Sequence, residues 1–170
     1  NHRRQRQMCI RDSIVAARND SPITRTNTLA KIVRDAVPRA KDGLDPATRT
    51  FMALRLHVND ELGELDRALE AAEQLLTTGG RLVVVSFHSL EDRRVKRFLQ
   101  QRSDDSAGTS RHVPLPETRP APSFRLLRRR SLTPTPEETD RNPRARSARL
   151  RAAERTDNPA WPPNSERIAA

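Results

Sequence analysis

The stretch Gly79-Gly-Arg-Leu-Val-Val-Val-Ser-Phe-His-Ser-Leu-Glu-Asp-Arg93 decides the fold class of this chain. Residues 82–85 are four consecutive apolar residues, three of them β-branched, and predict a strand that is buried on both faces. Such strands belong to parallel sheets that helices flank. The apolar residues that follow at helical spacing predict a helix that opens at Ser89. We therefore expect an α/β protein.

Polar side chains gather where this strand ends and the helix begins; they are Ser86, His88, Ser89, Glu91 and Asp92. In open α/β sheets, ligands bind beyond the carboxyl ends of the strands, and a helix N-terminus adds hydrogen-bond donors. We expect these residues to form one wall of a pocket. The alternative is that His88 bonds to backbone, Ser89 is an N-cap, and both acidic residues only interact favourably with the positive end of the helix dipole. A hydrolase triad is disfavoured, because no Gly-x-Ser-x-Gly turn occurs.

A long apolar stripe precedes the strand. Asp45-Pro46 is a helix start signal. The residues behind it recur at steps of 3 and 4 and predict one amphipathic helix of about 30 residues, with the acidic residues on its other face. The stripe consists of Phe51, Leu54, Val58, Leu62, Leu65, Leu69, Ala72 and Leu76. Two shorter helices are predicted between Ile14 and Val37. Because residues 1–80 offer no partner strand, we expect the end of an α/β domain without its beginning.

The remainder of the chain is polar, with two short strand candidates, at residues 124–127 and 147–153. The 170 residues carry a net charge of +10, and residues 119–155 hold 11 arginines against four acidic residues. Such a basic segment is typical of nucleic-acid binders, although it also fits a generic solvated surface. No apolar run is long enough to cross a bilayer, which argues against an integral membrane protein.

Cysteine and histidine usage argues against metal and disulfide sites. Cys9 is the single cysteine of the chain, which excludes an internal disulfide framework and a multi-cysteine metal site. The four histidines are scattered without the spacing of metal ligands. We therefore expect no bound metal and a reduced, cytoplasmic setting.

Several motifs in order resemble the bacterial family of 16S ribosomal RNA cytosine-N4 methyltransferases. They are Thr48-Arg-Thr-Phe-Met-Ala-Leu-Arg-Leu-His-Val-Asn-Asp-Glu-Leu62, residues 79–98, Ile23-Thr-Arg-Thr26 and residues 142–155. The resemblance implies a Rossmann-like class I methyltransferase domain interrupted by a helical insertion. It also implies methyl transfer from S-adenosylmethionine to the N4 amine of a cytidine in the decoding region of 16S rRNA, on the small ribosomal subunit. The resemblance allows a homodimer but does not decide the oligomeric state.

The resemblance covers only the carboxy-terminal half of that family. Its glycine-rich cofactor loop has no match here, so we expect the first half of the sheet to be absent, the chain to be inactive alone, and no cofactor residue to lie in it. The predicted organisation is 1–12 unmatched and artefactual, 13–45 helical insertion, 46–102 methyltransferase domain, 103–122 disordered loop, 123–155 terminal strands of the methyltransferase domain, and 156–170 disordered tail.

By the resemblance, the polar corner at residues 86–92 forms a wall of the reaction pocket, where His88 or Glu91 orients the base or relays a proton. The predicted RNA contacts are Arg49, Arg55, Asn59, Arg93, Arg97, Asn142, Arg144 and Arg146. The alternative for Arg49 and Arg55 is pairing with acidic residues such as Asp45 and Asp60. A stand-alone RNA-binding module without catalysis and a basic structural ribosome-associated protein are the competing hypotheses for the whole chain.

Overall fold

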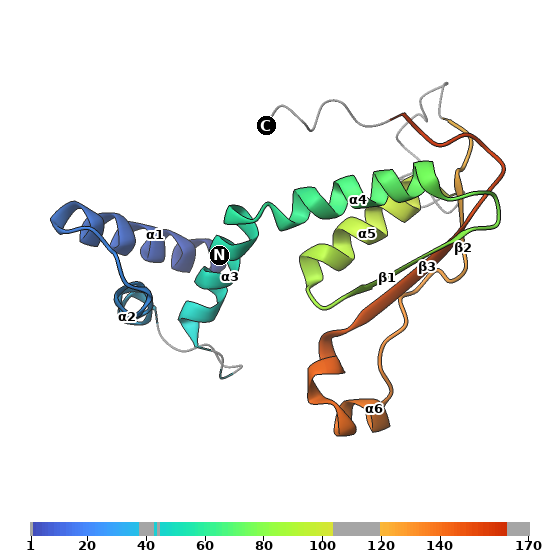
Figure 1. Ribbon diagram of the computed structural model, residues 1–170. Helices are drawn as coiled ribbons and strands as arrows, with labels where there is room; N and C mark the ends of the chain where they lie inside the picture. The colour runs from blue at the N-terminus through green and yellow to red at the C-terminus, as the bar shows by residue number, and fades with distance from the viewer. Residues whose placement is uncertain (1, 38–42, 44, 104–119, 163–170) are drawn as a thin grey trace. The chain divides into compact units, whose positions relative to one another are not determined.

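The computed structural model describes residues 2–37, 43, 45–103 and 120–162 (Figure 1). The chain divides into two compact units, Asn1–Glu61 and Leu62–Ala170. The first unit is helical, and the second combines a three-stranded sheet with helices. The chain is thus an α/β protein, as the sequence predicts.

The first unit consists of the helices α1 (His2–Asp20), α2 (Thr26–Ala36) and α3 (Pro46–Val58). Its core is Ala30, Val33 and Ala47, against which Ile10, Ile14, Leu29 and Phe51 pack. The predicted start signal is confirmed, because the Asp45 side chain accepts a hydrogen bond from the Ala47 N–H at 2.9 Å and Pro46 follows the cap. Helix α1 also includes residues 2–12, which the sequence analysis took to be unmatched and artefactual.

The predicted single long helix is wrong, because the structure divides it at Asn59-Asp60. Asn59 caps α3, and Asp60 has a φ of +47° before α4 (Glu61–Leu75) begins. Asn and Asp tolerate this left-handed region better than most residues, so this pair can end a helix in the middle of an apolar stripe. The apolar residues of this stripe are therefore divided between two cores. Phe51 packs in the first unit and Leu69 in the second, while Val58 is exposed.

This break also separates the packing units. The first unit ends at Glu61, so α3 belongs with α1 and α2, whereas the sequence analysis grouped residues 46–102 into one domain. The assignment of residues 46–61 to a methyltransferase domain stays a prediction.

The second unit continues from α4 through the strand β1 (Arg81–Ser86) to α5 (Ser89–Gln101). Then follow β2 (Phe124–Leu126), α6 (Pro136–Arg141), the 3-10 helix η2 (Pro143–Ser147) and β3 (Arg149–Arg155). The two strand candidates late in the sequence are therefore confirmed. The strand and helix predicted around Ser86 are confirmed as well.

The three strands form one sheet in the order β1-β3-β2, with β3 antiparallel to both neighbours. Val84 lies opposite Arg151, and Phe124 lies opposite Arg155. The prediction of a parallel partner for β1 is not met within the described residues. Strand β3 instead lies between β1 and β2, which leaves β1 at an edge of the sheet.

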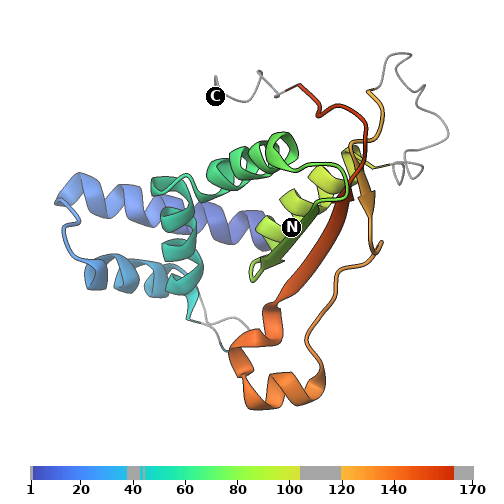
Figure 2. The ribbon, with the colours of Figure 1, turned by 45° about the vertical axis from the view of Figure 1, so that its right-hand side comes forward.

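Helices α4 and α5 pack against one face of this sheet (Figures 1 and 2). The buried core of the unit is Leu69, Val95, Phe98, Leu99, Phe124 and Ala153, with Leu82 and Val84 packed against it. Because side chains alternate along a strand, Val83 and Val85 point away from this core and are 54% and 51% exposed. The prediction that β1 is buried on both faces is therefore wrong for the described structure.

Candidate functional site

Ser86 ends β1 and is buried. Its hydroxyl donates to the backbone oxygen of Arg149 at 3.5 Å, across the pair of strands. The side chain therefore holds the start of β3 against the end of β1. Ser89, which is exposed, is the first residue of α5.

His88 and Glu91 form a capping box at the start of α5. The Nδ1 atom of His88 accepts a hydrogen bond from the Leu90 N–H at 3.4 Å. Oε2 of Glu91 accepts from the backbone N–H groups of His88 and Phe87, at 3.2 and 3.3 Å. Reciprocal bonds of this kind satisfy the free N–H groups of a helix start. The structure thus matches the alternative weighed from the sequence for His88, while the N-cap is His88 rather than Ser89.

The bond that Nδ1 accepts from the Leu90 N–H favours one tautomer of neutral His88. A neutral imidazole carries one proton, and a nitrogen that accepts a hydrogen bond is the unprotonated one. The proton of neutral His88 therefore lies on Nε2. This nitrogen is a hydrogen-bond donor and cannot at the same time accept a proton from a substrate.

Asp92 is held by Arg151 on β3, a residue that the sequence analysis missed. The guanidinium donates from Nε to Oδ1 at 2.7 Å and from Nη2 to Oδ2 at 3.1 Å, and the side chains are only 13% and 21% exposed. Paired donation of this kind is the strong geometry of Arg and carboxylate. The available signal was strand alternation: Arg151 lies opposite the inward-facing Val84, so it needs a partner.

The five corner residues therefore share one region of the fold, but most of their polar atoms already serve the helix start and the β3 strand. Their role as a pocket wall stays a prediction. Within the described residues, the structure gives no bond for His88 Nε2, for the Ser89 hydroxyl or for Oε1 of Glu91.

The predicted RNA-contacting residues fall into three groups. Arg55 and Asn59 both bond to Glu61, from Arg55 Nε to Oε1 at 2.8 Å and from Asn59 Nδ2 to Oε1 at 3.2 Å. Arg55 therefore has an acidic partner, as the alternative proposed, although it is Glu61 rather than Asp60. Arg49 lies exposed on α3, and Asp45 accepts bonds from Arg34, so the alternative of acidic pairing stays open for Arg49.

The other two groups lie in the second unit. Arg93 and Arg97 are exposed on α5, one turn apart. Asn142 ends α6, and Arg144 and Arg146 are exposed on η2 directly after it. The RNA role of these residues stays a prediction.

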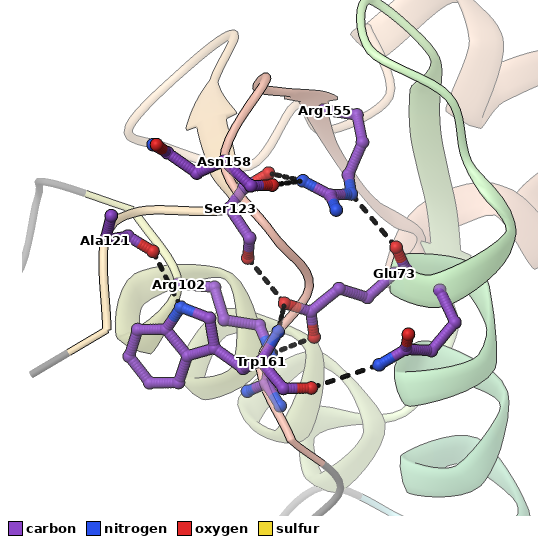
Figure 3. A network of polar contacts seen from close by, with 8 residues as sticks. Glu73, Arg102, Ala121, Ser123, Arg155, Asn158 and Trp161 are labelled. Carbon is purple, nitrogen blue, oxygen red and sulfur yellow. Dashed lines mark hydrogen bonds and ion pairs between the residues drawn. The ribbon is translucent and has the colours of Figure 1, made fainter.

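A buried polar network lies at the opposite end of α4 and α5 (Figure 3). Glu73 is 1% exposed, and its carboxylate is bonded by Arg102 Nε, by the Ser123 hydroxyl at 2.5 Å and by the Trp161 N–H at 3.0 Å. Arg155 donates to the Glu73 backbone oxygen at 2.9 Å. The sequence analysis placed the acidic residues of this helix on its outer face, which is wrong for Glu73. The signal was its spacing, since Glu73 stands four residues after Leu69 on the buried stripe.

The same network includes residues 156–161, which the sequence analysis assigned to a disordered tail. The Trp161 indole N–H donates to the Ala121 oxygen at 2.8 Å, and Asn158 Nδ2 donates to the Pro122 oxygen at 2.8 Å. Arg102 lies between two rings, 4.0 Å from the centroid of Phe98 and 5.4 Å from that of Trp161. This segment therefore joins the loop before β2 to the ends of α4 and α5.

A shallow hollow lies beside α5, and Arg151, the partner of Asp92, is among the residues that line it. It is lined from α5 by Lys96 and Gln100, from the chain after β2 by Arg128 and Arg129, and from β3 by Arg151. Its apolar lining includes Leu99 and Leu126. No acidic side chain is among the described residues that line it.

The described residues do not fit S-adenosylmethionine, which the resemblance implies. A small-molecule site needs polar groups that converge on an enclosed volume. The corner carboxylates are committed to the capping box and to Arg151, and the hollow beside α5 is lined by cations, which repel a sulfonium. We therefore assign no residue of this chain to the cofactor. Among the described residues, no cluster of His, Cys, Asp and Glu could hold a metal ion, and no helix there could span a membrane.

Comparison with known proteins identifies a family. Residues 2–156 match the MraW methylase family. This range includes residues 2–12, which the sequence analysis expected to have no match in the family. The chain is 61% identical over 150 residues to the ribosomal RNA small subunit methyltransferase H of Paramagnetospirillum magneticum, which covers 88% of this chain and 47% of that protein. It is 64% identical over 148 residues to the protein of the same name from Rhodospirillum centenum, with 87% and 45% covered. The chain thus spans less than half the length of these relatives.

Proposed function

Since this chain belongs to the MraW methylase family, we propose that it forms part of an enzyme that methylates the ribosomal RNA of the small subunit. One observation carries the proposal: 56–64% identity, over nearly nine-tenths of this chain, to three proteins of that name. The enzyme would act in the cytoplasm, where it meets small ribosomal subunits. The homodimer stays a prediction.

The proposed reaction moves a methyl group from S-adenosylmethionine to the exocyclic N4 of a cytidine in the decoding region of 16S rRNA. The amine loses one proton in exchange for the methyl group. Its lone pair is delocalised into the ring, so the enzyme has to hold it in line with the methyl donor. We propose that the residues that bind the donor belong to the part of the longer protein that this chain does not contain.

We further propose that the corner at residues 86–92 forms one wall of the nucleoside pocket. The tautomer of His88 favours a specific role there. Its Nε2–H can donate to an acceptor on the base, such as a ring nitrogen or carbonyl oxygen, and so orient the base. The alternative role of proton relay is disfavoured for neutral His88, and Glu91 is disfavoured for it because its carboxylate caps α5.

The sheet supports the proposal that this chain acts only when joined to further sequence. Strand β1 stands at a sheet edge, and the exposed Val83 and Val85 lie on the face that no described helix of the unit covers. An apolar edge strand of this kind invites pairing with another strand. We propose that residues preceding this chain in the longer protein pair with β1 and cover this face.

A second candidate function is an RNA-binding module without catalysis. The exposed arginines on α5 and η2 favour it, because they are in place without any cofactor. The two functions differ in one respect that can be measured, which is methyl transfer.

The test is a chimera. The chain replaces the matching portion of the Paramagnetospirillum magneticum relative, and the product is incubated with small ribosomal subunits and labelled S-adenosylmethionine. We expect N4-methylcytidine in the digested 16S rRNA with the chimera, and none with the 170-residue chain alone. The natural relative is the positive control, and circular dichroism verifies that the chimera folds. A folded chimera that binds subunits but transfers no methyl group would favour the binding module.

A further inference from the structure

His88 lies between two points at which the chain is fixed to strand β3. Two residues before it, the Ser86 hydroxyl donates to the Arg149 oxygen at 3.5 Å. Four residues after it, the Asp92 carboxylate accepts two bonds from Arg151, at 2.7 and 3.1 Å. Strand β3 therefore holds both flanks of the turn that presents His88.

The Asp92 contact is passed on to His88 by the first turn of α5. The Asp92 N–H donates to the His88 backbone oxygen at 3.0 Å. In the same turn, the Glu91 carboxylate accepts from the His88 N–H at 3.2 Å. Arg151 is thus linked to His88 by one side-chain pair and one backbone hydrogen bond.

The bonds from Arg151 are the stronger of the two attachments. A hydroxyl bond of 3.5 Å is longer than the usual range and contributes little. Arg151 instead meets both oxygens of a carboxylate, which fixes the orientation of the partner as well as its distance. The Arg151 and Asp92 side chains are only 13% and 21% exposed, so salt screens them less than a surface pair. Arg151 therefore sets how the first turn of α5 lies on the sheet.

We infer that Arg151 is a positioning residue for the proposed reaction, because through Asp92 it sets where Nε2 of His88 meets the base. The inference rests on the proposed function for that reaction. A displacement of about 1 Å, caused by a residue away from the chemistry, can slow an enzyme about 10²-fold. The competing interpretation is an ion pair that only stabilises the fold. The two differ in whether the loss of Arg151 still matters once His88 is gone.

The first test is a double-mutant cycle in the chimera. Arg151→Met removes the donors but keeps a long side chain, and we expect it to lower methyl transfer to small subunits about tenfold. In a His88→Asn background, the same substitution should lower methyl transfer by less than about twofold, because the group that it positions is already absent.

The matched control is Glu73→Gln, which breaks a buried ion pair of the same unit at the opposite end of α5. It should change methyl transfer by the same factor in both backgrounds, because loss of stability alone does not act through His88.

The second test measures amide hydrogen exchange by NMR in the 170-residue chain, and it needs no methyl transfer. The Leu90 and Asp92 N–H groups are both bonded to His88. We expect both to exchange about tenfold faster in Arg151→Met, since the lost charge-assisted bonds no longer hold this turn closed. Their exchange should be unchanged in Glu73→Gln.

Equal acceleration in the two variants would overturn the inference, since the effect would then be one of overall stability. Losses of methyl transfer that multiply across the two backgrounds would also overturn it, while the active chimera would still support the proposed function. Faster exchange confined to Arg151→Met supports the positioning of His88 even if the unsubstituted chimera is inactive, a result that counts against the proposed function alone.

Circular dichroism verifies that each variant folds. If Arg151→Met does not fold, Arg151→Lys replaces it in both tests. Lysine keeps the charge but donates from a single nitrogen, so it cannot reproduce the paired bonds to Asp92. We expect the same dependence on His88 with a smaller loss of methyl transfer, and a loss that is independent of His88 would overturn the inference.

Discussion

His88 illustrates how one side chain serves the fold and leaves one atom for chemistry. Its Nδ1 caps α5, and Glu91 completes the capping box from the third position of the helix. The remaining ring nitrogen is the one that the proposed function uses. Substitutions can therefore separate the two roles.

We expect His88→Ala to lower the free energy of unfolding of this chain by about 1 kcal/mol, and His88→Asn to restore most of that loss, because Asn is a good N-cap. Urea unfolding measures both. In the chimeric enzyme, both variants should lose methyl transfer if Nε2 orients the base. An Asn variant with full activity would reduce His88 to a helix cap.

Among the substitutions considered, replacing Glu73 should lower the free energy of unfolding most. Its carboxylate compensates the buried guanidinium of Arg102 and accepts from Ser123. We expect Glu73→Gln to lower the free energy of unfolding by about 3 kcal/mol, because one partner of a buried ion pair is left without compensation. The double variant Glu73→Gln/Arg102→Met should be less destabilised than the sum of the single variants. Additive losses would show that the pair is not coupled.

At the scale of elements, the segment at residues 156–161 connects parts of the chain that lie far apart in sequence. Trp161 reaches the loop before β2 through its indole N–H, and its backbone bonds to Glu73 and Gln74 on α4. The family match ends at residue 156, so most of this segment lies outside it.

We expect Trp161→Ala to lower the free energy of unfolding by about 2 kcal/mol, since it removes a ring stacked on Arg102 together with one hydrogen bond. Trp161→Phe keeps a ring without the N–H and should lose about half as much. Circular dichroism during urea unfolding measures both. In the unsubstituted chain, fluorescence of this single tryptophan should change at the same urea concentration as the helix signal. A separate, earlier change would mean that the segment does not pack with the unit.

The sequence predicted where strands and helices form better than it predicted how those elements are buried and which neighbours they have. The β-branched run before Ser86 and the amphipathic pattern after it were enough to place β1 and α5, because both signals are local. The burial of β1 was predicted wrongly, since it depends on which strands and helices are present beside it. The division of the long helix depended on the backbone of Asp60, which hydrophobic spacing does not reveal.

For the candidate site, the sequence likewise predicted the residues that are neighbours along the chain but not the contacts between distant segments. The corner at residues 86–92 could be proposed from the sequence because its polar residues are contiguous, and its role as a pocket wall stays a prediction. Arg151, Arg128 and Arg129 meet α5 only through the sheet order β1-β3-β2, which no local pattern contains. Contacts that depend on topology therefore had to come from the structure.

For the whole molecule, we propose that this chain is one part of an rRNA methyltransferase whose sheet continues beyond β1. The exposed edge of β1 and the uncovered valines on its outer face support this claim, and so does the share of the relatives' length that the chain spans. The claim predicts that β1 changes its surroundings when the preceding part of the protein is present.

The most direct test is amide hydrogen exchange across Arg81–Ser86, compared between this chain and the chimera. An edge strand leaves alternate N–H groups without a strand partner, whereas a central strand pairs them on both sides. We expect markedly slower exchange for this segment in the chimera, with exchange in α6 unchanged as an internal reference. Equal exchange rates in the two proteins would contradict the proposed extension of the sheet, because β1 would then remain an edge strand in the longer protein.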